Sequence, residues 1–547
     1  MKLLSQRLIM KQLLTVGVAL LSLSAQAQLV VQNGATFFID AGATVTVQGD
    51  VTASANISGS GKLLMKGTSL QSLNLNGFSV PNLEIDNAAN VVMAGAGRVD
   101  GILTFTTGKL QLGNFNLTMA NAGSFAGAGT GKFVETNGTG ELRKEMTAAG
   151  TVSLPVGLGS DFTPLQFQVT GGSYSSAFVG GRAVSGGHPA KHPRTSDFLN
   201  HYWSLNRSGI TGATVTTMGT YVDPADVTGT EADMRAMTYD GSNWALGSSQ
   251  DNTGNTVTAP MSGNTGDLYA MNRFVLVSPK VFLQGAFNSG TGLMSDALRS
   301  TDVTQTPGNA SSNNLIPTSD PYRTAPLSTN FTHVNNLVAE SINSSVLNHL
   351  ANPNDHIVDW VFLELRNNST SGNTVLQTRS ALIQRDGDIV DIDGVSPVYF
   401  KNVDAGNFSV GIRHRNHIGI YTNPASFTPT LSLASSTLNL TTISSASLMG
   451  AANSSYFNDG SRNMLFAGNS SQNTRVSYSG SGIDASYILS SILSSNASGN
   501  LNNIYSVGDV NFNRRVTYSG SGNDASYILS TPLASAPSTI RTEVKPN

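Results

Sequence analysis

The sequence predicts a mainly β protein with N-terminal β-solenoid-like repeats, two β-sandwich-like domains and a small α-containing duplicated module at its C-terminal end. Apolar residues alternate with Thr, Ser and Asn along much of the 547-residue chain, which is the period of a strand with one buried face. Gly, Asn and Asp interrupt these runs about every eight to twelve positions, as turns do. The segment Arg475–Leu489 recurs almost unchanged as Arg515–Leu529, which indicates an internal duplication.

The composition is typical of an extracellular β-rich protein. Charged residues make up 12 % of the chain, whereas an ordinary soluble domain has about 25 %. The 31 basic and 34 acidic residues nearly cancel, and no Lys/Arg run could neutralise a row of phosphates, so nucleic acid is not an expected partner. Because the chain has no cysteine, its stability has to come from packing, strand hydrogen bonds or metal rather than disulfides.

Residues 1–27 have the pattern of a Sec-type signal peptide. Basic residues precede an apolar run from Leu13 to Leu23, and Ala25-Gln26-Ala27 provides a small-x-small cleavage site before Gln28. The run is too short to span a bilayer, and no later segment reaches about 18 consecutive apolar residues. We therefore expect a secreted or outer-cell-surface protein with no transmembrane segment.

Changes of pattern divide the chain into six expected segments. These are a signal peptide (1–27), a β-solenoid-like repeat region (28–150), a β-sandwich (151–278), a second β-sandwich (279–425), a linker (426–463) and the duplicated module (464–547).

Residues 28–150 contain short alternating runs that share a rhythm but not a sequence. Such loose repeats are typical of a β-solenoid, in which each coil buries its apolar face only by stacking on its neighbours. A twisted β-sandwich is the alternative, and we favour the solenoid.

Residues 151–278 contain longer alternating strands and two tryptophans, Trp203 and Trp244. An exposed indole could stack on a sugar ring, but a core indole with its N–H hydrogen-bonded explains both residues equally simply. We favour the core position for both.

Residues 279–425 contain the densest set of carboxylates and a basic cluster. The carboxylates could serve glycoside hydrolysis or Ca²⁺ binding, but their places at Asp-Gly turns favour solvated hairpin acids. In the motif RHRNH, His414 and His417 fall on opposite faces of a strand, so they could share a zinc ion only across a turn. We expect the long basic side chains here to pair with the acidic cluster or with backbone carbonyls. The carboxylates are Asp386, Asp388, Asp391 and Asp393.

The duplicated module has oxygen-bearing side chains at alternate positions before each apolar, helix-like segment. Loops that wrap Ca²⁺ have this spacing, and an acidic residue at the start of the following segment could serve as both ligand and helix N-cap. The candidate ligands are Asp509, Asn511, Asn513 and Asp524 in the second copy and Asn469, Ser471, Asn473 and Asp484 in the first.

This duplication resembles a degenerate dockerin, a module of two calcium-loop-and-helix units that docks one extracellular protein to another. The resemblance implies calcium as a cofactor and an extracellular protein as a partner. A metal-free pair of stacked helix hairpins is the alternative, since one copy is too small to bury its own apolar face and its twin can supply the other half. The insert YSGSG places Asp524 later than the last ligand of the family pattern.

The chain as a whole resembles large secreted surface proteins of Bacteroidetes-type bacteria, some of them hemagglutinin-like or adhesin-like. The resemblance rests on the order of its parts: the repetitive region, the segments VSLPVG and YWSLNRSG, the opening VFLQGAFNSGTGLMSDALR and the motif RHRNH. The resemblance implies a surface or secreted protein and no catalytic residue. Such chains often end in a sorting domain, whereas here we expect only a short tail ending in RTEVKPN.

Two classes of function follow from these patterns. The first is a secreted or cell-surface, non-enzymatic binding or adhesive protein that contacts an extracellular protein or a glycan surface, and the absence of G-x-S-x-G, H-E-x-x-H and Walker A motifs favours it. The alternative is an extracellular carbohydrate-active enzyme, a polysaccharide lyase or glycosidase, or a carbohydrate-binding protein. A lyase needs grouped basic residues on one face, but the basic residues of the repeat region are widely separated. They are Lys62, Lys66, Arg98 and Lys109.

Overall fold

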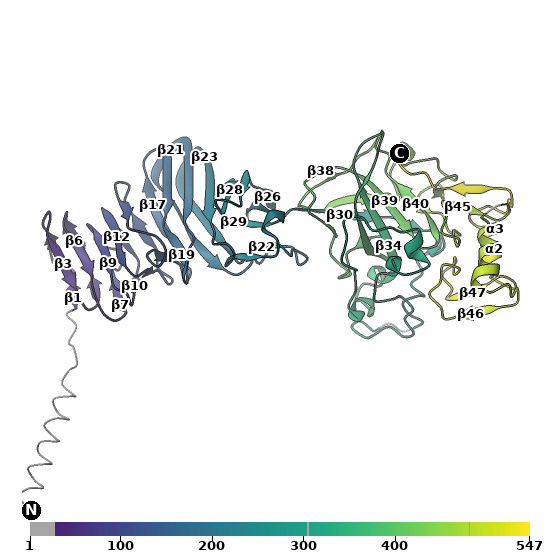
Figure 1. Ribbon diagram of the computed structural model, residues 1–547, viewed down its shortest axis with the longest axis horizontal. Coiled ribbons are helices and arrows are strands. Elements are labelled where there is room, and N and C mark those ends of the chain that lie inside the picture. Colours follow the sequence, from purple (N-terminus) through teal and green to yellow (C-terminus); the bar gives the residue numbers. More distant parts are fainter. Residues whose placement is uncertain (1–27, 303–305, 481) are drawn as a thin grey trace, which may run out of the picture. The chain divides into compact units, whose positions relative to one another are not determined.

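The computed structural model describes residues 28–302, 306–480 and 482–547 (Figure 1). These residues form two compact units, with the boundary in the sequence between Asn272 and Arg273. Strands dominate both units, so the predicted fold class is confirmed: mainly β, with an N-terminal β-solenoid, further sheet-rich regions and few helices. None of the helices in the described ranges is long and apolar enough to cross a membrane. The predicted signal peptide, 1–27, lies outside the described residues.

Unit 1 begins with a β-solenoid of about six turns. Three parallel sheets form its faces, because strands from successive coils stack in register. The first sheet contains β1 (Leu29–Val31), β4 (Val51–Ala53), β7 (Gln71–Asn74), β10 (Val91–Gly95), β13 (Leu110–Gln111), β16 (Val134–Glu135) and β19 (Val156–Leu158), followed by the antiparallel β20 (Asp161–Phe162). The second contains β3 (Thr44–Val47), β6 (Lys62–Met65), β9 (Leu83–Asp86), β12 (Ile102–Thr107) and β15 (Ser124–Ala126). The third face carries the pair β2 (Phe37–Ile39) and β5 (Ile57–Gly59) and then β8 (Ser79–Val80), β11 (Gly97–Val99), β14 (Leu117–Met119) and β17 (Leu142–Met146).

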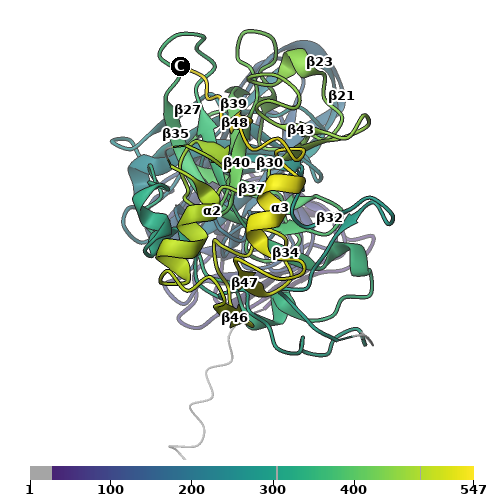
Figure 2. The same cartoon turned by 90° about the vertical axis from the view of Figure 1, so that its right-hand side faces the viewer.

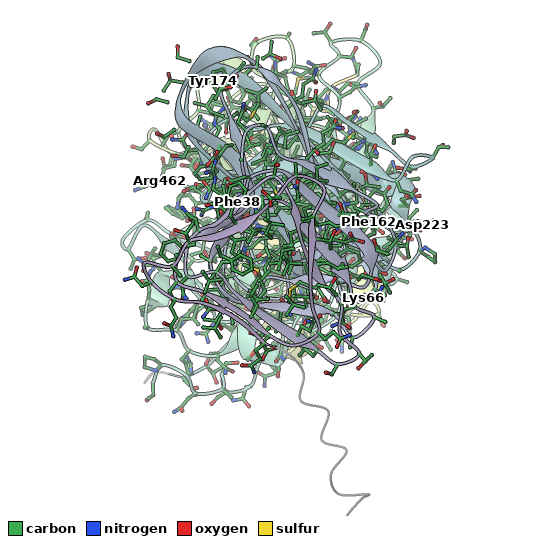
Figure 3. The ribbon with its side chains drawn as sticks, turned by 90° about the vertical axis from the view of Figure 1, so that its left-hand side faces the viewer. Phe38, Lys66, Phe162, Tyr174, Asp223 and Arg462 are labelled. Carbon is green, nitrogen blue, oxygen red and sulfur yellow. The ribbon has the colours of Figure 1, made fainter. Side chains whose placement is uncertain are left out.

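Stacked apolar side chains fill the inside of the solenoid. Leu63 pairs with Leu83, and Leu83 with Leu103, so that three fully buried leucines lie directly above one another. The alternate residues of these strands point outwards, and Phe38, labelled in Figure 3, is one of the outward side chains on the first coils. Because each coil contacts only its neighbours, the core depends on this alternation from coil to coil.

Asparagines at the turns connect one coil to the next. The Asn90 carboxamide oxygen accepts the Lys109 N–H, and that of Asn116 accepts the Glu141 N–H, each from the following coil. Asn is suited to these corners, because its side chain can replace a backbone acceptor and it tolerates positive φ, as at Asn90.

The sheet of the third face continues beyond the solenoid. Its last parallel strand, β17, pairs antiparallel with β21 (Leu165–Ser185), which pairs along most of its length with β23 (His201–Thr220). The region predicted as a separate sandwich, 151–278, therefore shares a sheet with the solenoid, which corrects that boundary. The physical reason is that β21 satisfies the backbone edge that the last coil would otherwise expose.

The remaining elements of unit 1 extend or cover this sheet. They are β18 (Gly150–Leu154), β22 (Phe198–Leu199), β24 (Val227–Thr228), η1 (Glu231–Asp233), β25 (Met234–Tyr239), β26 (Trp244–Leu246), β27 (Ser249–Asp251), β28 (Thr256–Pro260) and β29 (Thr265–Asn272).

Unit 2 is built around a five-stranded antiparallel sheet. Its order is β36 (Ile389–Val390), β35 (Val375–Gln384), β34 (Ile357–Arg366), β39 (Ser409–His414) and β40 (His417–Tyr421). Every residue of the central strand β34 is buried, so both faces of the sheet are covered. Smaller sheets and short helices cover it: β30 (Phe274–Lys280), β31 (Phe282–Leu283), β32 (Phe287–Asn288), β33 (Leu293–Met294), η2 (Pro321–Arg323), η3 (Leu327–Thr329), η4 (Ser344–Leu347), η5 (Pro353–Asp355), β37 (Val398–Lys401), β38 (Gly406–Asn407), β41 (Thr430–Leu431), β42 (Ser436–Asn439), η6 (Ser445–Ser447), β43 (Phe457–Asn458) and β44 (Asn463–Leu465).

Residues 426–463, predicted as a linker, are part of the unit 2 core. Strand β42 pairs in parallel with β30, and Leu438, Leu448 and Tyr456 are buried in the main apolar cluster. The prediction of a linker is therefore wrong. The physical reason is that a Ser/Thr-rich segment can cover a sheet with only a few apolar residues, provided that a strand distant in the sequence pairs with the backbone of the segment.

The duplicated module has two equivalent strand-and-helix copies that exchange partners. The first copy contains β45 (Arg475–Ser477), α2 (Asp484–Tyr487), the π-helix η7 (Ile488–Ile492) and β46 (Asn500–Asn502). The second contains β47 (Arg515–Thr517), α3 (Asp524–Ser530) and β48 (Ile540–Thr542). Strand β45 pairs with β48, and β46 pairs with β47, so each copy completes the other's sheet. The helices α2 and α3 lie side by side (Figure 2).

This module also packs on the rest of unit 2. Ile418 and Phe466 join Val476, Ile488 and Ile528 from the two copies in one buried cluster. The apolar residues of the two copies are therefore covered within unit 2.

Candidate functional site

The second loop of the module is organised around two buried carboxylates. Asp509 accepts the N–H groups of Asn513 (3.0 Å) and Arg514 (3.0 Å). Asp524, at the first residue of α3, accepts the N–H groups of Val510 (3.1 Å) and Thr517 (2.9 Å). Both carboxylates therefore hold the loop in shape through its own backbone.

The amide side chains of this loop also contact its backbone. The Asn511 oxygen accepts the Asn513 N–H at 3.2 Å, while its nitrogen donates to the Gly522 carbonyl. The Asn513 oxygen accepts the Arg515 N–H at 2.9 Å. The four ligands predicted for this copy thus all belong to one loop, and each makes a hydrogen bond within it.

The first loop repeats this arrangement with one carboxylate. Asp484 accepts from Ser471, through both its N–H (3.0 Å) and its hydroxyl (2.8 Å), and from the Ser477 N–H (2.9 Å). Asn469, which replaces the Asp509 of the other copy, donates to the Asn473 carbonyl. The four predicted residues again share one loop, with less negative charge.

Burial raises the pKa of each acidic residue in the two loops. The pKa rises to about 6 for Asp509, to about 8 for Asp524 and to about 7 for Asp484, although backbone N–H groups oppose these shifts. The negative charge of Asp509 adds to the rise at Asp524, so these two carboxylates are close enough to repel each other. A carboxylate oxygen has a second lone pair, so both residues could bind a cation and keep their hydrogen bonds. Because the second loop has two carboxylates and the first loop has one, the second loop fits Ca²⁺ better than the first.

Calcium binding stays a prediction, and melting of the full chain tests it. We expect the melting temperature to be higher in millimolar Ca²⁺ than in chelator, because an ion at a hundredfold its dissociation constant stabilises the folded state by about 2.7 kcal/mol. Asp509→Ala should remove most of this difference and Asn469→Ala little, since Asp509 has a carboxylate and Asn469, its equivalent in the first copy, has none. Equal melting of the wild type in Ca²⁺ and chelator would leave the internal hydrogen bonds as the whole role of these residues.

The RHRNH motif forms a tight hairpin between β39 and β40, and its histidines face each other. The Nδ1 atoms of His414 and His417 are 3.1 Å apart, and His417 Nε2 accepts the Gly285 N–H. His417 therefore carries its proton on Nδ1, where the Asn416 carboxamide oxygen at 2.8 Å is the nearer acceptor, and His414 Nε2 donates to Asp359 at 3.0 Å. Burial, together with His414 and Arg415, holds the pKa of His417 well below its usual range. The turn does bring the two imidazoles together, with their Nδ1 atoms 3.1 Å apart.

Asp359 is the centre of this network. Its Oδ2 accepts from His414 and from Arg415 Nε (2.8 Å), and its Oδ1 accepts the Tyr505 hydroxyl (2.6 Å) and the Trp360 N–H (2.8 Å). Burial alone would raise the pKa of this carboxyl, but Arg415 and His414 lower it to about 2. Asp359 is therefore an ionised, fully buried carboxylate with four donors.

Arg415 joins this network to the duplicated module. Its Nε binds Asp359, its Nη1 donates to the Ser506 carbonyl, and its guanidinium carbon lies 4.5 Å from the centre of the Tyr505 ring. We expected the basic residues of this motif to bind backbone carbonyls or the acidic cluster at 386–393. Arg415 does bind a backbone carbonyl, but the carboxylate that it binds is Asp359, which is not part of that cluster.

A cavity of about 480 Å³ lies beside Arg415 within unit 2. One wall comes from the segment 317–327, which contains η2 and the start of η3. The opposite wall comes from Tyr487, Ser491 and Ile492 of the first copy and from the segment 505–507 that follows it. The volume lies within the range of about 300 to 1,000 Å³ that is usual for small-molecule sites.

The predicted acidic cluster is divided among structural contacts. Lys280 binds Asp388 (2.7 Å) and lies 3.4 Å from Asp386, and Asp393 accepts the N–H groups of its own turn. Asp391 is buried and pairs with Arg379 at 3.1 Å. Three of the four are thus turn or surface acids, as expected, and Asp391 differs because it anchors a buried arginine.

The basic residues of the solenoid are also paired. Lys62 binds Glu84, and Lys66 binds Asp86 at 2.9 Å, in each case on the neighbouring coil. Lys109 pairs with Glu135 of the next coil, and Arg98 with Glu145 two coils further on, both at 2.9 Å. Each of these four basic groups therefore has an acidic partner within unit 1.

The two tryptophans of unit 1 both donate to backbone carbonyls. Trp203 is fully buried, and its indole N–H donates to Thr163. Trp244 is half-buried, donates to Ala190 and packs edge-on against His188 at 4.8 Å. The predicted core position is confirmed for Trp203, and Trp244 lies at the edge of an aromatic cluster.

One further group in the described part of the chain has metal-ligand spacing: Asp320, His333 and Glu340. Arg323 lies 3.2 Å from Asp320, and Arg379 lies 2.7 Å from Glu340. These two guanidinium groups already supply the positive charge that a metal ion would bring, which disfavours an ion there.

Sequence reasoning missed Asp359 and Tyr505. A signal for Asp359 existed, because an acidic residue inside the apolar run HIVDWVFLEL has to be buried with a cationic partner. No comparable signal marks Tyr505, whose place depends on how the module packs against β34 and β39.

Comparisons with known protein families, with curated proteins and with solved structures found no match. The resemblances to dockerins and to surface adhesins therefore stay predictions, and the function has to be argued from the residues themselves.

Proposed function

We propose that this chain is a secreted or cell-surface binding protein without catalytic activity, which adheres to an extracellular protein or glycan surface. The observation that supports it most directly is the cavity beside Arg415. Its Arg415 and Tyr505 side chains are held in place by Asp359, so the site is preorganised for binding. The low charge and the export-type leader in the sequence agree with an extracellular location.

Pairing of charges favours binding over catalysis. His414 and His417, in the same hairpin as Arg415, are buried and donate their protons within the hairpin and to Asp359. A general base needs a lone pair within reach of a substrate proton. A binding site needs only fixed walls and a few hydrogen-bonding groups, and the cavity has both.

Surface labelling and binding together test this proposal. On intact cells, external protease should remove the chain, or the chain should be found in the medium, and its mature N-terminus should be Gln28. The purified chain should be retained saturably on at least one surface from a panel of immobilised glycans and extracellular matrix proteins, without releasing product. A cytoplasmic location, retention on none of these surfaces, or release of unsaturated or reducing sugars would contradict the proposal.

A further inference from the structure

We propose that the cavity beside Arg415 binds an apolar loop of a second copy of this chain. This inference rests on the proposed binding function and deepens it, because it names the partner of the same site. Three observations carry it: a strongly exposed apolar loop in unit 2, the apolar walls of the cavity, and direct backbone pairing between that loop and one of the walls.

The loop is the segment 335–339, which we call the finger. Its Leu337 and Val338 side chains are 96 % and 80 % exposed, and no other large apolar side chain in the described ranges is exposed to the same degree. Single exposed apolar residues are normal on a protein surface, whereas adjacent ones indicate a contact surface. Burial of both side chains against a partner would be favourable because it removes apolar area from water.

Hydrogen bonds hold the backbone of the finger in one conformation. Arg323 donates from Nη2 to the carbonyls of Asn336 (2.6 Å) and Val338 (3.0 Å). The Asn336 carboxamide in turn donates to the Glu340 carboxylate at 2.7 Å. Because the finger is already ordered, it loses little conformational entropy when its apolar side chains are buried in an interface.

The cavity offers an apolar surface to these side chains. A cavity of about 150 Å³ is enough for a six-carbon ring. The cavity of about 480 Å³ therefore has room for a leucine and a valine side chain, each of which is smaller than that ring. Ser319 and Ser491 on opposite walls are exposed, so the cavity is open to solvent. Its apolar lining residues include Pro317, Pro321, Leu327, Tyr487 and Ile492.

The base of the finger is joined to the rim of the cavity. Ser341 forms an antiparallel bridge with Ser319, and the Asp320 N–H donates to the Glu340 carbonyl at 3.0 Å. Ser319 and Asp320 both line the cavity. Val338 is two residues from Glu340, so its Cα lies within about 8 Å of that of Glu340. The apolar tip of the finger therefore stands beside the cavity.

This adjacency lets two copies bind each other reciprocally. When a two-fold axis passes between finger and cavity, each finger enters the cavity of the other copy, and the interface is closed and isologous. A different protein with an apolar loop could fill the cavity, but the finger would then stay in water. A second copy covers both the finger and the cavity, which is why we infer that the partner is the chain itself.

The oligomeric state of the full chain tests the inference. Sedimentation velocity at concentrations up to about 100 μM should show a reversible dimer, since a small interface gives weak association. Leu337→Asp should raise the dissociation constant by about a hundredfold or more, because a charge replaces a buried leucine in both contacts. Leu70→Asp is the matched control: Leu70 is 56 % exposed in unit 1, and its replacement should leave the dissociation constant unchanged.

Ser491→Trp changes the cavity and leaves the finger intact. Ser491 is an exposed residue of the cavity lining, so the indole should exclude the finger and weaken the dimer by about tenfold or more. An equimolar mixture of Leu337→Asp and Ser491→Trp chains then tests the reciprocal geometry. In the mixed dimer, the intact finger of the Ser491→Trp chain meets the intact cavity of the Leu337→Asp chain. The mixture should therefore associate more tightly than either variant alone.

Thermal melts and a second cavity variant keep the test independent of folding. Leu337→Asp should leave the melting temperature unchanged, because Leu337 is exposed in the single chain. If Ser491→Trp lowers that temperature, Thr324→Trp, at an exposed position of the opposite wall, takes its place. A monomeric wild type at every concentration, a dimer that survives both substitutions, or a mixture no more associated than its components would overturn the inference. A monomer that is still retained on the glycan or protein panel would leave the proposed binding function standing and remove only this partner.

Discussion

Asp359→Asn is expected to lower the free energy of unfolding of unit 2 by about 3–5 kcal/mol, the usual cost of removing one partner from a buried ion pair. The carboxylate accepts from His414, Arg415, Tyr505 and the Trp360 N–H, and all of it is buried. An asparagine has one acceptor oxygen and adds two donors, so at least one N–H would point at another. Arg415 would also keep a buried positive charge without its counter-ion.

A surface ion pair in the same unit provides the control. Asp404 binds Arg273 at 2.8 Å, but its side chain is 62 % exposed. Asp404→Asn should therefore change the stability by at most about 1 kcal/mol. Thermal or denaturant unfolding of both variants measures the difference. Equal and small losses would show that the Asp359 network contributes no more than a surface contact.

Acid should remove part of the Asp359 contribution. The folded pKa is about 2, below the ordinary value of about 3.9, so the charged form is favoured by folding. The contribution is therefore complete above about pH 4 and is lost as the pH falls towards 2. The stability difference between the wild type and Asp359→Asn should shrink over that interval, and a constant difference would contradict the assignment of the charge to Asp359.

The solenoid could be predicted because its core depends on short-range pattern. Each strand stacks on the next coil, so alternation and turn residues within a few dozen positions contain most of the information. The mutual support of the two repeat copies could be inferred in the same way, from their near identity and small size.

The errors arose where distant segments pair. Nothing local in residues 426–463 indicates that β42 pairs with β30, whose residues lie far earlier in the chain. Likewise, β17 of the solenoid pairs antiparallel with β21 of the following region. Both regions have the same alternation of apolar and polar residues, so the alternation does not show that their strands share a sheet. Periodicity shows that a strand exists, but it does not show which edge that strand meets.

The candidate site shows the same limit. RHRNH was visible as a cluster, and Asp359 could have been recognised as its partner because it interrupts an apolar run. The cavity could not, because its walls come from segments 317–327 and 487–507, which meet only when the duplicated module packs on the sheet.

Leu83→Ala is expected to lower the free energy of unfolding of unit 1 by about 2–5 kcal/mol, the usual cost of a buried Leu-to-Ala change. Leu83 is fully buried and lies between Leu63 and Leu103 of the neighbouring coils. The lost side chain would leave a cavity that two coil interfaces share. Because a solenoid is held together by contacts between neighbours, this change weakens both interfaces at once.

Ile102→Ala is the matched control for this change. Ile102 begins β12, on the coil next to Leu83, but its side chain is 45 % exposed, so its loss should change the stability by about 0.5 kcal/mol or less. Scanning calorimetry of the full chain should show that Leu83→Ala shifts the transition of unit 1 alone, whereas Asp359→Asn shifts that of unit 2 alone. Equal losses for Leu83→Ala and Ile102→Ala would mean that the stacked leucines do not form the core of the solenoid. A shift of both transitions by either variant would mean that the two units unfold together.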